Sequence, residues 1–114
     1  MQTMRPSLQA FKADFFRALA HPIRIRILEA LGRGEHTVQE LQEALSLEQP
    51  ITSQQLAVLR SKNVVTARKV GTTVRYALSD PLITRLLGVA REIFNNHFVD
   101  SQALLKELQR ETRR

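Results

Sequence analysis

The feature that most constrains the fold is a pair of short helical patterns separated by a three-residue connector. Thr37, followed three residues later by Glu40, predicts a capping box that opens a short amphipathic helix. Residues 47–49 form the connector, and Pro50 suits the first turn of a second helix because its missing N–H costs nothing there. A short capped helix joined tightly to a second helix predicts a helix-turn-helix over residues 37–63.

The second helix of this pair, residues 50–62, has two chemically different faces. Leu56 and Leu59 share one side of the helical wheel with Thr52. The opposite side is small and polar, with Ser53, Gln54, Ala57, Arg60 and Ser61. An exposed face normally carries Lys and Glu, so this set favours contact with a ligand, although an ordinary solvated face is the alternative. In a helix-turn-helix this helix enters the major groove of DNA, where Arg60 can make a bidentate contact to guanine.

Residues 64–79 predict a β-hairpin that follows the second helix directly. The segment changes to β-branched residues, and residues 70–72 mark the turn between two short strands. Strand alternation places Val74, Tyr76 and Leu78 inward, and Thr73 and Arg75 outward. A lone hairpin is marginally stable in water, so it is expected to pack on the helices. Arg68 and Lys69 lie close to the turn, whose tip can approach the phosphate backbone or minor groove of DNA.

Three further helical patterns flank these elements. Residues 8–20 and 22–31 carry apolar residues at steps of three and four, and a long helix is predicted over 80–109, with Asp80 as N-cap and Pro81 at its first position. The apolar residues of this last helix cover more than one side, so one side is expected to meet a second copy. The prediction is a single winged helix-turn-helix domain over residues 1–114, mainly α with a small β-hairpin. Its order is four helices, two strands and a final helix, with the wing at 64–79 and dimerisation through 8–20 and 80–109.

The charge balance narrows the class of partner. Seventeen Lys and Arg against eleven Asp and Glu give a net charge of +6, which favours a polyanion such as double-stranded DNA. The excess is local, because residues 64–79 contain cations and no acid. A generally solubilising positive surface is the alternative. No stretch approaches the ~20 apolar residues of a membrane span, and residues 1–5 do not open a secretory signal, so a cytoplasmic location without membrane contact is expected.

The predicted DNA contacts come from the second helix of the pair and from the hairpin. Hydroxyl and amide side chains hydrogen-bond both phosphates and base edges, and cations pair with phosphates. The full set is Thr52, Ser53, Gln54, Gln55, Ala57, Arg60, Arg68, Lys69, Thr72 and Arg75.

Three stretches of the chain resemble the ArsR/SmtB family of metalloregulators. The sequence FRALAHPIRIRIL at 16–28 is similar to the family pattern F-x-A-L-x-x-P-x-R-x-x-I-L. QPITSQQLAVLR at 49–60 resembles the family's recognition helix, and RKVGTTVRYAL at 68–78 resembles its wing. The resemblance extends over about residues 10–95. It implies a homodimer, joined through the first and last helices, that binds a near-palindromic operator and usually represses transcription.

The resemblance also bears on what the protein senses. The chain has no cysteine, which excludes thiolate sensing. Zinc- and nickel-sensing members carry an Asp-x-His pair early in the last helix, but here Pro81 and Leu82 follow Asp80, so that His is missing. The family's later His-x-x-acid pair is present as His97 and Asp100, about one helical turn beyond its usual place. The resemblance thus implies Ni²⁺ or Zn²⁺ at the dimer interface as a candidate effector, while a merely solvated His97 is the alternative.

Two other classes of function are weighed against DNA binding. A winged helix can serve as a protein-interaction module, in which Arg68 and Lys69 hold an acidic partner. Such docking surfaces favour exposed aromatic or aliphatic residues, which the outer face of residues 50–62 lacks. An enzyme is disfavoured because the sequence has no Gly-rich phosphate loop, no His-Glu-x-x-His helix and no visible nucleophile elbow. A sequence-specific DNA-binding regulator is therefore the leading hypothesis.

Overall fold

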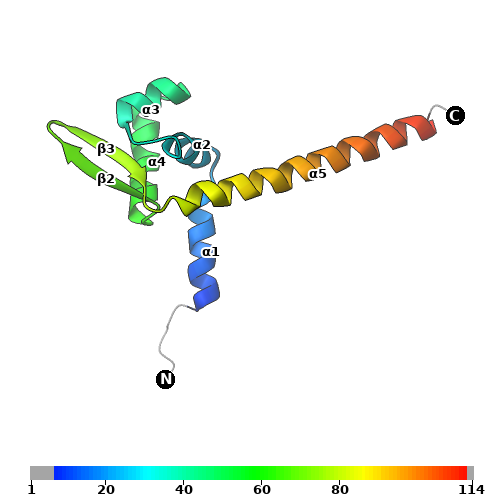
Figure 1. Cartoon of the computed structure of the whole chain (residues 1–114), viewed down its shortest axis with the longest axis horizontal. Coiled ribbons are helices and arrows are strands. Elements are labelled where there is room, and N and C mark those ends of the chain that lie inside the picture. The colour runs from blue at the N-terminus through cyan, green and yellow to red at the C-terminus, as the bar shows by residue number, and fades with distance from the viewer. Residues whose placement is uncertain (1–6, 113–114) are drawn as a thin grey trace. The chain divides into compact units, whose positions relative to one another are not determined.

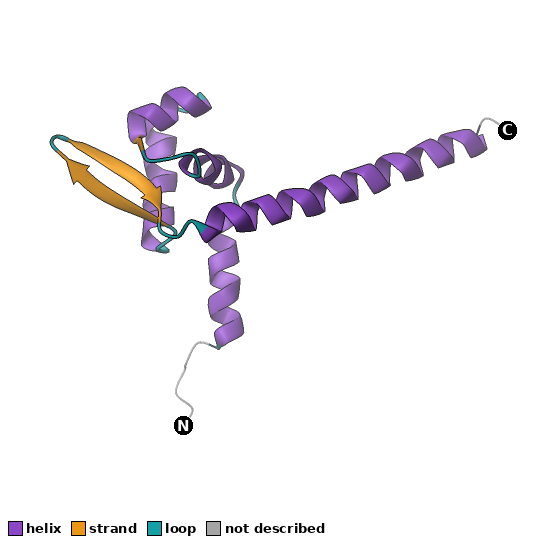
Figure 2. Cartoon of the chain, viewed as in Figure 1, coloured by secondary structure: helices purple, strands orange, loops and turns teal. Residues whose placement is uncertain are grey.

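The predicted helices and hairpin are present in the computed structural model, which describes residues 7–112. These residues divide into two compact units, the first ending at Pro81 and the second beginning at Leu82. The first unit contains α1 (Leu8–Leu19), α2 (Pro22–Leu31), β1 (His36–Thr37), α3 (Val38–Leu45), α4 (Gln49–Ser61), β2 (Val65–Val70) and β3 (Thr73–Leu78). The second unit is α5 (Leu82–Thr112). A mainly helical winged helix-turn-helix is thereby confirmed (Figures 1 and 2).

The core of the first unit lies where α2, α3 and α4 meet the base of the hairpin. Its largest deeply buried apolar side chains, each at most 2% exposed, are Ile27, Leu28, Leu41, Leu56, Leu59, Val64 and Val65. Full burial of such a side chain contributes roughly 1.5–3 kcal/mol. Because α4 and the start of β2 supply residues to the same core, the outer face of α4 and the hairpin are held on one support.

Three helices of the first unit, α1, α2 and α3, begin at residues whose side chains accept from a free backbone N–H group. The backbone N–H of Glu40 donates to Thr37 Oγ1 at 3.1 Å, and the N–H of Thr37 donates to Glu40 Oε1 at 2.8 Å, which confirms the capping box of α3. At α2, the N–H of Ile23 donates to His21 Nδ1 at 3.1 Å. His21 therefore acts as a helix cap.

Two polar residues in the left-handed backbone region end the two helices of the helix-turn-helix. Ser46, at φ 54°, ends α3, and Asn63, at φ 59°, follows α4. Short polar side chains tolerate this conformation better than most other non-glycine residues. Arg26 of α2 also donates to the carbonyl of Leu45 at 2.6 Å and so satisfies the end of α3. Ser46 and Arg26 thus set the direction in which the chain leaves α3 and enters α4.

The sheet has three strands, in the order β1-β3-β2, and not the two that were predicted. The additional strand β1 pairs antiparallel with β3, with His36 opposite Tyr76 and Thr37 opposite Arg75. A strand of two residues is too short to produce an alternating pattern, so the predicted element order lacked it. The hairpin β2–β3 turns through Gly71 and Thr72, with Gly71 at φ 63°, as the first position of a type II′ turn requires.

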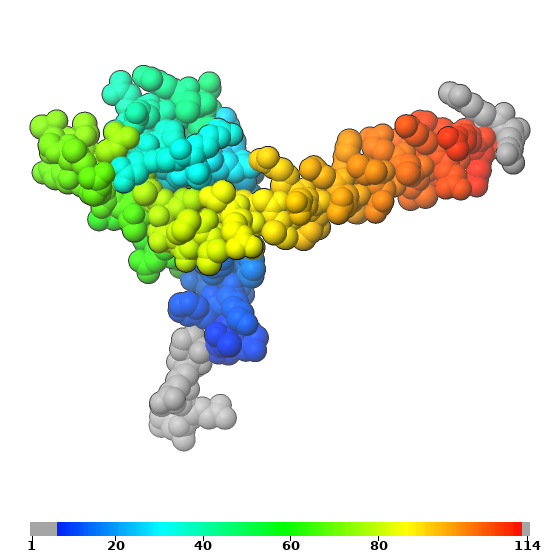
Figure 3. Space-filling view, viewed as in Figure 1, coloured from blue at the N-terminus to red at the C-terminus, as the bar shows by residue number. Residues whose placement is uncertain are grey.

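The inward orientation predicted for Val74 is wrong. Val74 pairs with Lys69 close to the turn and is 36% exposed. In Figure 3 the light green hairpin projects from the rest of the first unit, so its tip has no helix to pack against. Burial is instead confined to the base of the hairpin, at Val65.

The helix α5 begins at Leu82 and ends at Thr112, so the predicted bounds 80–109 were displaced by two or three residues at each end. Pro81 lies in the turn before the helix, and strong helix formers after residue 104 carry it further. Its exposed large apolar residues, each at least 50% exposed, are Leu82, Val89, Ile93, Phe94, Phe98, Val99, Leu104, Leu105 and Leu108. No helix within residues 7–112 has the length and apolar character of a membrane span.

Candidate nucleic-acid interface

The two faces of α4 separate as the helical wheel predicts. Thr52, Leu56 and Leu59 are buried, whereas Gln54, Ala57, Arg60 and Ser61 are exposed and Ser53 is partly exposed. The assignment of Thr52 as a DNA contact is therefore wrong. Its side chain is 0% exposed, and its hydroxyl donates to the carbonyl of Glu48 at 2.9 Å. Thr52 stabilises the start of α4 from inside the core.

Two amide side chains near the start of α4 differ in their surroundings. Gln49 Nε2 donates to Ser53 Oγ at 2.9 Å, which leaves the Ser53 hydroxyl free to donate its own hydrogen. Gln55 is only partly exposed, and its Oε1 is buried without a hydrogen-bond partner among residues 7–112. The exposed amide best placed to read base edges on this helix is therefore Gln54.

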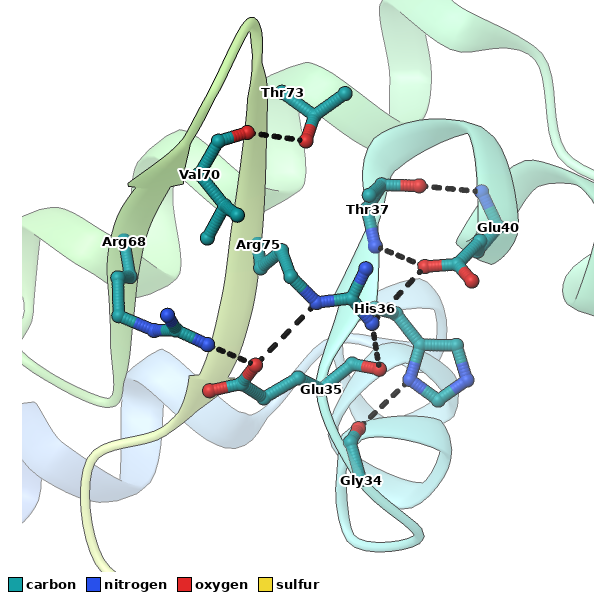
Figure 4. Close-up of polar contacts among 9 residues, drawn as sticks. All are labelled: Gly34, Glu35, His36, Thr37, Glu40, Arg68, Val70, Thr73 and Arg75. Atoms are coloured by element: carbon teal, nitrogen blue, oxygen red, sulfur yellow. Dashed lines mark hydrogen bonds and ion pairs between the residues drawn. The ribbon is translucent and has the colours of Figure 1, made fainter.

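A cluster of charged residues joins the hairpin to the segment before α3 (Figure 4). Glu35 Oε2 accepts from Arg68 Nη2 at 2.7 Å and from Arg75 Nε at 3.3 Å. Arg75 Nη2 also donates to the Glu35 carbonyl at 3.2 Å and lies 3.5 Å from Glu40 Oε1. Arg75 of β3 thereby contacts Glu35, just before β1, and Glu40 of the α3 capping box, while Arg68 comes from β2. We name these four residues the Glu35 cluster.

The carboxylates of the Glu35 cluster have lowered pKa values. The hydrogen bond from Arg68 lowers the pKa of Glu35 below its ordinary value, with further contributions from Arg75. The backbone N–H of Thr37 lowers the pKa of Glu40, with a further contribution from the charge of Arg75. Both carboxylates are therefore ionised at neutral pH, and each favours the nearby guanidinium groups in their present positions.

The Glu35 cluster changes which hairpin cations are available to a polyanion. Arg75 is 31% exposed and is held by two acids, whereas Arg68 is 63% exposed and pairs with one. Lys69, next to the turn, and Arg60 on α4 have no carboxylate partner within residues 7–112. Sequence reasoning missed Glu35, because it lies 33 residues before Arg68 and 40 before Arg75 and no local pattern links them.

The candidate metal pair gains no further ligand in one protomer. His97 and Asp100 are both exposed on α5. No group of three or more His, Cys, Asp or Glu side chains that could hold a metal ion occurs among residues 7–112. Two exposed ligands do not make a complete site for Ni²⁺ or Zn²⁺, so the residues of a single chain do not fit the metal that the resemblance implies.

Comparison with known proteins assigns the chain to a family. Residues 21–67 match the family described as bacterial regulatory protein, arsR family. An uncharacterized HTH-type transcriptional regulator of Mycobacterium tuberculosis, Rv0081, is 44% identical over 102 residues, which span 89% of this chain and 90% of the relative. The chain belongs to the arsR family. Its curated relatives are transcriptional regulators, which are not enzymes, in agreement with the expectation from sequence.

Solved structures support the arsR assignment at the level of the fold. The crystal structure of Rv0081 is similar with a TM-score of 0.76 and 43% identity, covering 85% of this chain and 98% of that one. The transcriptional repressor BigR of Xylella fastidiosa has a TM-score of 0.68 and 32% identity, covering 73% and 85%. A homodimeric winged helix-turn-helix DNA-binding domain of Mycobacterium bovis, from a possible ArsR-family regulator, has a TM-score of 0.74 and 28% identity, covering 85% and 91%.

The segment that matches the arsR family ends within β2. It runs from the N-cap of α2, at His21, through α4 to Ala67. Glu35 and the polar face of α4 therefore lie inside the matched segment, while Arg68, Lys69 and Arg75 follow it. In this arsR-family protein the Glu35 cluster thus connects the matched segment to the hairpin beyond it.

Proposed function

We propose that this arsR-family protein is a homodimeric repressor that binds a near-palindromic operator in double-stranded DNA. The observation that carries the proposal is the exposed face of α4, which is polar with Arg60 as its cation and lies beside a hairpin whose Lys69 has no carboxylate partner among the described residues. In a winged helix-turn-helix, such a helix reads the major groove while the hairpin contacts the backbone or minor groove. A regulator of bacterial DNA acts in the cytoplasm, where that DNA lies.

The proposed DNA contacts follow from exposure and charge. On α4 they are Ser53, Gln54, Gln55, Ala57 and Arg60, and on the hairpin they are Lys69, Thr72 and Arg68, whose charge is already balanced by Glu35. Gln54 is assigned to base reading and Lys69 to phosphate. Arg75 becomes a positioning residue, because its guanidinium holds Glu35 and Glu40 and is mostly covered.

The proposed dimer uses the apolar faces that the protomer leaves exposed. Phe11 of α1 is 72% exposed and Phe94 of α5 is 68% exposed. Apolar surface of this extent on two helices favours association with a second copy, in line with the homodimeric M. bovis domain. Phe11→Asp and Phe94→Asp are expected to shift the protein from dimer to monomer in sedimentation equilibrium. Ile51→Asp, which places the same change on α4, is the matched control and should leave the dimer intact.

The decisive experiment is a selection from randomised duplexes with the purified dimer. We expect enrichment of one inverted-repeat sequence. Gln54→Ala should change which bases are preferred, whereas Lys69→Ala should weaken binding to every duplex alike. Failure to enrich any sequence would remove the operator-binding function, and capture of an acidic protein through Lys69 in its place would support an interaction module.

A further inference from the structure

A hollow open to solvent lies between α4 and β3. Its volume is about 440 Å³, and its lining residues are Ser53, Leu56, Ala57, Arg60, Ser61 and Tyr76. Five of these come from α4, with the buried Leu56 as the floor residue among them, and Tyr76 comes from β3. From the sequence, Tyr76 is predicted to lie inward and Ser61 belongs to the polar face of the helix, but neither is among the predicted DNA contacts. The hollow therefore contains polar groups that the predicted interface did not include.

The lining of the hollow suits an anion. Arg60 has no carboxylate partner within the described residues, and no Asp or Glu lines the hollow. The Ser53 hydroxyl accepts from Gln49 and can donate its own hydrogen outward. No hydrogen bond within residues 7–112 uses the phenol of Tyr76. Cationic and neutral donors without an acid are the groups that hold phosphate oxygens in protein–DNA complexes.

The position of the hollow selects the sugar-phosphate backbone as its occupant. When α4 lies in the major groove and the hairpin reaches the adjacent minor groove, one DNA strand must pass between them, because the strand separates the two grooves. The hollow is bounded by α4 on one side and by β3 on the other. The small side chain of Ala57 leaves room there for a deoxyribose.

We propose that this hollow cradles a backbone phosphodiester of the bound operator, with Tyr76, Ser53 and Arg60 as donors. The proposal rests on the proposed DNA-binding function and adds Tyr76 to the interface. It also moves Arg60 from reading guanine to contacting phosphate. The contact is independent of base identity, so its loss weakens binding to all duplexes without changing which sequence is preferred.

The test removes one hydroxyl from the protein and one charge from the DNA. Tyr76→Phe is expected to weaken binding about tenfold per protomer, and so about 100-fold for the dimer, on operator and scrambled duplexes alike, since a hydrogen bond to a charged group is lost in each protomer. The matched control is Thr66→Val, which removes an exposed hydroxyl from β2. Ala67 pairs with Tyr76, and Thr66 is the residue before Ala67, so the Thr66 side chain lies on the opposite face of the hairpin from Tyr76. Thr66→Val should bind as the wild type does.

A scan of operators with single methylphosphonate substitutions identifies the phosphate. At one position in each half-site the neutral linkage removes the anionic oxygen, and the difference in affinity between Tyr76→Phe and wild type should be smallest there. Ser53→Ala places a strong helix former in α4. Its loss of affinity relative to the wild type should also be smallest at the same position, so this variant provides the test if Tyr76→Phe fails to fold. The proposed phosphate site would be contradicted if Tyr76→Phe bound as tightly as the wild type. It would also be contradicted if the difference in affinity between the two proteins were the same at every substituted position. If wild type selects no operator at all, the proposed function fails and not the cradle alone.

Discussion

The salt dependence of DNA binding follows from how many interface cations are free of carboxylates. In each protomer Arg60 and Lys69 have no such partner among residues 7–112, whereas Arg68 and Arg75 share Glu35. Two such cations in each protomer give four in a dimer. Each neutralised phosphate contributes about −0.9 to the slope of log K against log salt, so we expect a slope of about −3.6. Full release of Arg68 and Arg75 would double this to about −7.2.

Fluorescence anisotropy with a labelled operator measures this slope. Between roughly 50 and 200 mM salt, a slope of about −3.6 lowers the affinity about 150-fold, whereas about −7.2 lowers it about 20,000-fold. Lys69→Ala should reduce the magnitude of the slope by about 1.8, because one cation is lost in each protomer. Glu35→Gln should raise it to about 5.4, since it frees Arg68 while Glu40 still holds Arg75.

The control for Glu35→Gln is Glu43→Gln, which neutralises an exposed acid of α3 that makes no ion pair within the described residues. Its slope should equal that of the wild type. A wild-type slope near −7 would refute the reasoning, because it would mean that DNA displaces Glu35 from both arginines. An unchanged slope in Glu35→Gln would refute it as well.

Three further outcomes are expected. Leu59→Ala should lower the free energy of unfolding in urea by about 2–5 kcal/mol, because the side chain is 0% exposed. Because the pKa values of Glu35 and Glu40 are lowered from 4.5, their contribution to stability is complete above that value and is lost as the pH falls through the folded-state pKa. Chemical unfolding from neutral to acid pH should show this loss, and Glu35→Gln should reduce it. If His97 and Asp100 hold Ni²⁺ or Zn²⁺ as an effector across the dimer, calorimetry should show that the metal and the operator change each other's affinity by the same factor. His97→Ala should abolish this change. If His97→Ala bound the metal as tightly as the wild type does, the pair would be excluded as the metal site.

The local patterns of the sequence were sufficient to predict α3, α4 and the turn between them. The capping box of Thr37 and Glu40 and the apolar stripe of Leu56 and Leu59 each join residues three apart, and the placement of Pro50 depends on that residue alone. Such interactions act within one helix, so their pattern can be read along the chain. The order of these elements was enough to predict the winged helix-turn-helix and the polar face of α4.

The tertiary structure decided which of the polar residues are available. Thr52 is polar by sequence but buried by the packing of α4, and Arg75 is basic by sequence but held by Glu35, a residue 40 positions earlier. The strand β1 exists because His36 and Thr37 meet β3, and Tyr76 lines a hollow because β3 lies beside α4. Each of these contacts joins residues far apart in the chain. Their partners depend on how separate elements pack, and no periodic pattern within one element records that.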